Sequence, residues 1–103
     1  MTINKLHKLT NAIKTINSFR DLKQNWNGYG AEPISEEVIN KALKLVKELE
    51  PIPEIFPTAN NSIQFEWETD DQVLYLEMEI FKDKIKVFNQ SEYRGETTTI
   101  GDE

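Results

Sequence analysis

The sequence contains no cysteine and only one histidine, His7. The missing cysteine excludes disulfides and thiolate metal sites, and small secreted domains commonly need disulfides, so we expect a cytoplasmic location. A nucleophilic Ser or Thr normally needs a neighbouring base, and zinc sites need His or Cys ligands at defined spacings. We therefore predict no catalytic residue, no cofactor and no metal site, and interpret His7 as a solvated surface side chain.

The sequence also lacks a long apolar run and a net basic charge. No stretch approaches the roughly 18 apolar residues of a membrane span, and lysines interrupt the N-terminal segment where a signal peptide would be continuous. The net charge of −6 is divided into +2 for residues 1–50 and −8 for residues 51–103. Nucleic-acid binding needs a basic footprint, so we expect neither direct nucleic-acid binding nor a membrane partner.

Amphipathic helices account for the first half of the chain. Apolar residues at three- and four-residue spacing predict a helix over residues 1–25. Ser18 and Asp21 resemble a capping box, which would divide this helix into two pieces, although one long element with a bend is favoured. Residues 35–50 are the second predicted helix, with Ser35 as its N-cap.

Residues 62–90 change to a period of two, which predicts a three-stranded antiparallel β-meander. Two-residue turns at 70–71 and 82–83 would set apolar residues opposite one another, as a one-sided sheet requires. The predicted apolar pairs are Trp67 with Leu74, Phe65 with Leu76, Ile63 with Met78, Ile80 with Ile85 and Met78 with Val87. The second hairpin also places Glu79 opposite Lys86, which is a favourable cross-strand pair.

The predicted fold is a single α+β domain over residues 1–103. Its two N-terminal helices pack on one face of the three-stranded sheet, in the order ααβββ. The proline-rich connection "PIPEIFPTANN" is expected to be extended. Residues 91–103 form a polar tail, in which "TTTI" could add a short edge strand.

The outward face of this sheet is the predicted binding surface. The alternation that buries Trp67 leaves aromatic and acidic residues on the other side. The candidate protein-binding residues are Tyr75, Phe88, Val73, Glu66, Glu77 and Glu79. Aromatic anchors rimmed by acids suit protein recognition, unless the C-terminal tail folds back over them. Carboxylate-pair catalysis is not favoured, because an open sheet face provides no desolvation.

The segment "NWNGYGAEP", residues 25–33, allows two interpretations. Trp26 and Tyr29 could stack on a small ligand. Alternatively, Gly28 and Gly30 break the helix and the segment is a structural corner. Trp26 continues the apolar stripe of the first helix, so we favour a corner built from Trp26, Gly28, Tyr29 and Gly30, with Tyr29 packed across it.

Two motifs carry a family resemblance. "NWNGYGAEPIS" before a helix and "IFPTANNSIQFEWE" at a strand resemble segments of a recurring group of small uncharacterised bacterial proteins. Those segments are W-(D/N)-G-Y-G-A-x-P-(I/V)-S and F-P-T…G-x-(I/L)-x-x-E-W. The resemblance covers about residues 22–88. Asn27 replaces the usual Asp, and Asn60-Asn61 replace a usual glycine. The resemblance implies a shared fold, implies no activity, and favours accessory, phage-related or antitoxin-like roles.

Three functions remain open at this point. The first is a non-enzymatic module that binds a protein partner through the outward sheet face, with Tyr75 and Phe88 as anchors. The second is an acidic mimic of nucleic acid that inhibits a DNA-binding protein. The third is a small-ligand binder that uses Trp26 and Tyr29. A homo-oligomer is compatible with each of them.

Overall fold

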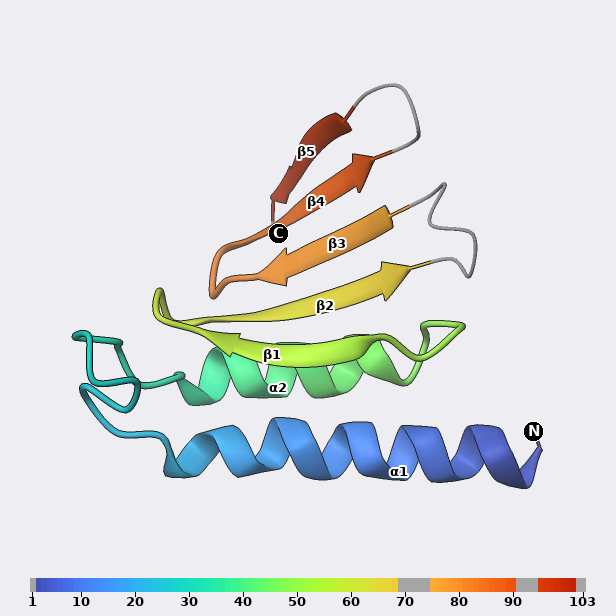
Figure 1. Ribbon diagram of the computed structural model, residues 1–103, viewed down its shortest axis with the longest axis horizontal. Coiled ribbons are helices and arrows are strands. Elements are labelled where there is room, and N and C mark those ends of the chain that lie inside the picture. Colours follow the sequence, from blue (N-terminus) through green and yellow to red (C-terminus); the bar gives the residue numbers. More distant parts are fainter. Residues whose placement is uncertain (1, 69–74, 91–94, 102–103) are drawn as a thin grey trace.

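The computed structural model describes residues 2–68, 75–90 and 95–101. Two α-helices and a short 3-10 helix precede an antiparallel sheet (Figure 1). The elements are α1 (Ile3–Ser18), η1 (Phe19–Asp21), α2 (Glu36–Val46), β1 (Glu54–Thr58), β2 (Ser62–Glu68), β3 (Tyr75–Ile80), β4 (Lys84–Gln90) and β5 (Gly95–Gly101). The predicted combination of two helices with an antiparallel sheet is confirmed, but the predicted three-stranded sheet is wrong, because the sheet has five strands.

Helix α1 continues directly into η1 instead of restarting at Ser18. Ser18 has helical backbone angles and makes no side-chain cap. Its hydroxyl instead donates to the carbonyl oxygen of Thr15 at 2.6 Å. The alternative in which a capping box at Ser18 starts a second helical piece is therefore wrong, because the hydroxyl bonds backward into its own helix. The helical segment ends at Asp21, whereas the prediction extended it to residue 25.

Helix α2 begins as the sequence predicts and ends earlier. The hydroxyl oxygen of Ser35 accepts from the amide of Val38 at 3.4 Å, so Ser35 is the N-cap. The helix ends at Val46, whereas the prediction extended it to residue 50. The amide of Glu48 bonds to the carbonyl three residues before it, at 3.0 Å, and this tighter turn ends the helix ahead of the prolines.

The strands follow one another in the sheet in sequence order, and each pair is antiparallel. The predicted β3–β4 register is confirmed, with Ile80 opposite Ile85. The predicted β2–β3 register is wrong by two residues, since Trp67 lies opposite Leu76 rather than Leu74. A two-residue shift keeps every side chain on its predicted face. The predicted turn at residues 70–71 lies outside the described residues.

Two strands extend the predicted meander, one on each side. Strand β1 forms within the segment predicted only to be extended, and it includes Pro57, which an edge strand tolerates. Strand β5 contains the predicted "TTTI" edge strand and pairs with β4. The described part of the tail is therefore the fifth strand of the sheet.

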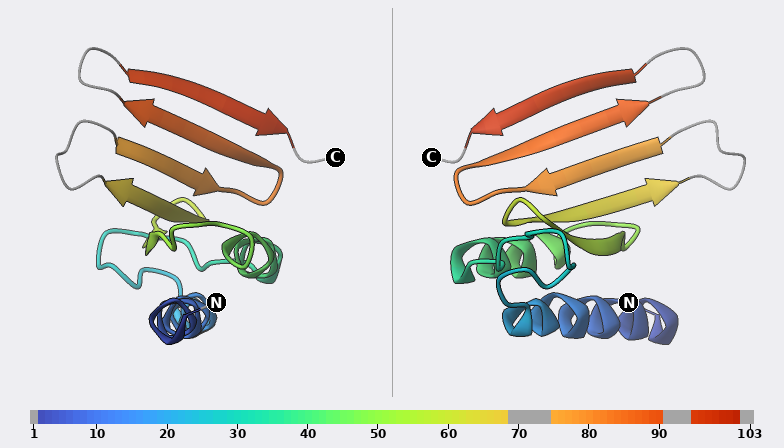
Figure 2. Two further views of the ribbon diagram at one scale, coloured as in Figure 1. Left: turned by 90° about the vertical axis from the view of Figure 1, so that its right-hand side faces the viewer. Right: turned by 60° about the vertical axis from the view of Figure 1, so that its left-hand side comes forward.

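The core lies between α2 and the first strands of the sheet. Helix α2 contacts β2 and β3, while α1 contacts α2 and β1. Ile16, Ile39 and Phe65 are fully buried, one from each of these layers. The remaining buried core residues are Ala12, Phe19, Ile34, Val38, Ala42, Val46, Ile63 and Ile80. The views in Figure 2 show β4 and β5 extending away from both helices.

Candidate functional site

The outward face of the sheet carries the predicted protein-binding residues on neighbouring strands. Glu77 of β3 lies between Glu66 of β2 and Phe88 of β4 in the strand register. Glu66, Glu77 and Phe88 are all half-buried. The core side chains of β2 and β3 point to the other side of the sheet, toward α2. Pairing therefore brings three of the six predicted residues into one row.

Acidic, basic and aromatic side chains line a hollow on this face. Glu77, Glu79, Lys86 and Phe88 line it, and its volume is about 220 Å³. Glu79 lies opposite Lys86 in the register, as predicted. A hollow with both signs of charge around an aromatic ring is suited to oriented polar contacts with another protein.

Phe81 also contributes to this face, although the sequence did not predict it. The ammonium groups of Lys84 and Lys86 lie 5.1 Å and 5.3 Å from the centre of its ring. Cations at this distance are attracted to the ring face. Its position next to the turn at 82–83 was visible in the sequence, but the approach of both lysines depends on the folded hairpin.

Glu79 has a structural partner. The hydroxyl of Ser62 donates to its carboxylate at 2.6 Å, and the hydroxyl of Thr58 lies 2.5 Å from that of Ser62. Ser62 is fully buried. A catalytic nucleophile must be accessible to substrate, and the hydroxyl of Ser62 is not, so this arrangement does not resemble a catalytic pair. The linked side chains of Thr58, Ser62 and Glu79 instead connect β1, β2 and β3.

Two of the predicted residues have no described side-chain position. Val73 lies outside the described residues. The backbone of Tyr75 belongs to β3, where it pairs with Glu68 on one side and Gln90 on the other. Tyr75 therefore occupies the same face of the sheet by register as Phe88.

The segment 25–33 folds as a hydrogen-bonded corner. The side-chain oxygen of Asn27 accepts from the amides of Tyr29 and Ala31, at 2.8 Å and 3.1 Å. Gly28 and Gly30 have φ angles of +79° and +83°, which explains the need for glycine at both positions.

The two aromatic residues of this corner differ in environment. The indole N–H of Trp26 donates to the carbonyl of Glu32 at 2.8 Å, and the ring is half-buried. Tyr29 is 92% exposed. The prediction that Tyr29 packs across the corner is wrong, because the loop satisfies its polar groups internally and turns this ring outward.

The corner is also attached to the β1–β2 turn. The amide of Glu32 donates to the carbonyl of Ala59 at 3.1 Å. The amide of Ser35 donates to the side-chain oxygen of Asn61 at 2.7 Å. Asn61 has a φ of +55°, which asparagine tolerates better than most residues. These two bonds fix the start of α2 against the sheet.

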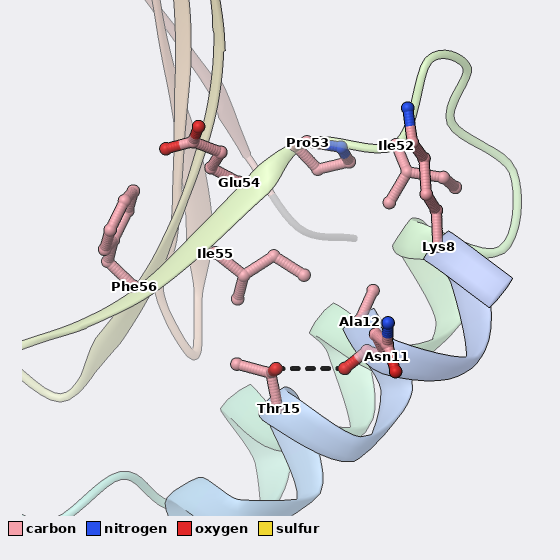
Figure 3. A pocket seen from close by; sticks show the side chains of 9 residues that line it. All are labelled: Lys8, Asn11, Ala12, Thr15, Ile52, Pro53, Glu54, Ile55 and Phe56. Atoms are coloured by element: carbon pink, nitrogen blue, oxygen red, sulfur yellow. Dashed lines mark hydrogen bonds between the residues drawn. The ribbon is translucent and has the colours of Figure 1, made fainter. Parts of the chain in front are cut away.

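A second hollow lies between α1 and β1, with a volume of about 580 Å³ (Figure 3). One wall comes from α1, and residues 52–56 provide the other. The hydroxyl of Thr15 donates to the carbonyl of Asn11 at 2.9 Å and is thereby occupied. Lys8 and Glu54 are its only charged lining residues among those described, so it offers no nucleophile with an adjacent base.

Within the described ranges, no three His, Cys, Asp or Glu side chains lie close enough to hold a metal ion. No helix in the same ranges has the length and apolar character needed to cross a membrane. Comparison with protein-family models, with curated proteins and with solved structures gives no match. The resemblance to small bacterial proteins stays a prediction.

Proposed function

We propose that the protein is a cytoplasmic, non-enzymatic interaction module of an accessory, phage-related or antitoxin-like kind. It binds a protein partner through the outward face of its sheet. Phe88 and Tyr75 act as anchors, while Glu66 and Glu77 orient the partner. The observation that carries this proposal is the position of Phe88 beside Glu77, in a hollow on the face opposite the helical layer.

The chemistry of this face favours a protein over other ligands. A few residues carry most of the binding energy at protein interfaces, and aromatic side chains are frequent among them, while nearby charges set orientation and specificity. Phe88 is partly exposed within the hollow and Phe81 is partly exposed beside it, with lysines and glutamates around them. A partner with both basic and acidic groups around an apolar patch matches this arrangement.

Two observations count against the alternatives. Lys84 and Lys86 interrupt the acidic surface, whereas a mimic of nucleic acid needs a continuous row of negative charge. In the corner, the indole N–H of Trp26 is already bonded to the backbone, and Tyr29 points to solvent. These two rings therefore do not form a pair of walls for a small ligand.

The test uses the protein as bait in its native host. Proteins retained by the wild type are quantified by mass spectrometry and compared with those retained by Phe88→Ala and Tyr75→Ala. Tyr29→Ala is the matched control, because it removes an exposed aromatic ring that belongs to no strand of the sheet. We expect a partner that the control retains and that both sheet-face variants lose.

The captured partner is then purified and its affinity measured by titration calorimetry. Removing an aromatic anchor commonly costs about 2 kcal/mol, so each sheet-face variant should weaken binding at least tenfold. Circular dichroism verifies that both variants remain folded. Binding that persists unchanged in folded Phe88→Ala and Tyr75→Ala would show that another surface makes the contact.

A further inference from the structure

The two edges of the sheet differ in their capacity to accept another strand. Strands β1 and β5 are the outermost strands of the described sheet. An edge strand presents a row of backbone N–H and C=O groups that can pair with an added strand. Proteins commonly block such edges with proline, charge or a covering element, so the residues of each edge indicate whether pairing is prevented.

The β1 edge is blocked. Pro57 has no N–H group, and prolines within sheets place this position on the unpaired side of an edge strand. Residues two apart direct their backbone groups to the same side, so Pro53 removes the next donor along that edge. Between these prolines, Ile55 is the one residue that directs an N–H group to the outer edge. Helix α1 also contacts β1, and its side chains stand beside the strand in Figure 3.

The β5 edge has none of these features. Its sequence, GETTTIG, contains no proline and no lysine, and its one charged residue is Glu96. Thr and Ile have high β-propensity. In the described part of the chain, β5 pairs with β4 on one side and with nothing on the other. Both helices lie away from it (Figure 2).

We propose that the β5 edge pairs with the β5 edge of a second copy of this chain. A two-fold axis between antiparallel strands passes through a residue that pairs with itself, and Thr98 is the middle residue of β5. Centring the axis there pairs all seven residues. Thr97 then faces Thr99 of the second copy, and cross-strand threonine pairs are favourable.

The charges of β5 agree with this partner. In the Thr98-centred register, Glu96 lies opposite Ile100 of the second copy and not opposite the other Glu96. The two copies each carry a net charge of −6, so an interface between them needs a segment that brings no like charges together. The central residues of β5, Thr97–Ile100, carry no charge and supply that segment.

Pairing at this edge produces a closed dimer. The two-fold axis is perpendicular to the sheet, so both helical layers lie on one side of a continuous ten-stranded sheet and both outward faces lie on the other. The outer edges of the dimer are the two blocked β1 strands, and growth stops there.

The experiment measures the mass of the full chain by light scattering across a range of concentrations. We expect a mass of twice 12.0 kDa for the wild type. Thr98→Lys and Thr98→Glu each place like charges opposite each other at the axis, so each variant alone should lose the dimer mass. Mixing the two variants pairs lysine with glutamate, and the dimer mass should return.

The matched controls are Asn40→Lys and Asn40→Glu, which make the same charge changes at an exposed position of α2. Both should remain dimeric. A wild-type mass of 12.0 kDa at every concentration would overturn the proposal. So would dimers that persist in each Thr98 variant alone, or variants that stay monomeric when mixed. Assemblies larger than two copies would refute the closed arrangement.

Discussion

Asn61 connects the β1–β2 turn to the start of α2, and its contribution can be separated into two parts. Its side-chain oxygen accepts from the amide of Ser35, and its backbone has a positive φ. Asn61→Gly removes the acceptor and keeps a backbone that glycine adopts without strain. Asn61→Ala removes the acceptor and adds strain. Asn61→Asp keeps an acceptor at the same place.

The structure sets the size of each effect. Leaving the partly buried amide of Ser35 unpaired costs about 1–2 kcal/mol, and the greater freedom of glycine in the unfolded chain adds about 0.5 kcal/mol. Asn61→Gly should therefore lower the free energy of unfolding by about 2 kcal/mol. Asn61→Ala should lower it by about 2–3 kcal/mol, because a left-handed backbone costs an alanine about 1–2 kcal/mol. Asn61→Asp should stay within about 0.5 kcal/mol of the wild type.

Urea unfolding followed by tryptophan fluorescence measures these differences, and thermal melts should show a fall of roughly 4 °C for each kcal/mol lost. The stability order is expected to be wild type and Asn61→Asp first, then Asn61→Gly, then Asn61→Ala. If Asn61→Gly is as stable as the wild type, the bond to Ser35 contributes nothing and the assignment of this residue as a link is refuted.

Three other outcomes are expected. Lys41→Met removes an ammonium that donates to the carbonyl of Phe81 at 2.9 Å, so it should lower the free energy of unfolding by about 1–2 kcal/mol. The control Lys44→Met changes an exposed lysine of the same helix and should leave the melting temperature unchanged. The hydrogen bond and charge of Lys5 lower the pKa of Glu50. The ion pair therefore stabilises the folded protein above the ordinary carboxyl pKa, and this stabilisation is lost as the pH falls through the lowered pKa of Glu50. In an NMR titration, Lys5→Met should raise that pKa toward its ordinary range.

The sequence predicts the two faces of the sheet because alternation is a local property. Ile80 and Ile85 are found opposite each other because the short turn between them leaves one register that places both on the inner face of the sheet. The β2–β3 register was predicted two residues away from the observed one, because the alternation of apolar and polar residues does not determine the length of the connecting loop. The assignment of faces survived this error, and with it the location of Phe88 and Glu77.

Other features depend on contacts between distant residues and could not be predicted from the sequence. Strand β1 contains Pro57 and lacks a clear alternation, so only its pairing with β2 identifies it as a strand. The bond from Ser62 to Glu79 joins residues 17 positions apart in sequence. Tyr29 was predicted to pack across the corner, but its ring is exposed, because the hydrogen bonds that shape the loop do not depend on it.

The placement of both helices at one end of the sheet gives the molecule uneven local stability. Residues of α2, β2 and β3 share one buried cluster, so opening any of them requires the whole cluster to separate. Strands β4 and β5 are held chiefly by the strands beside them. We therefore expect the β4–β5 end of the sheet to open more readily than the end that packs against the helices.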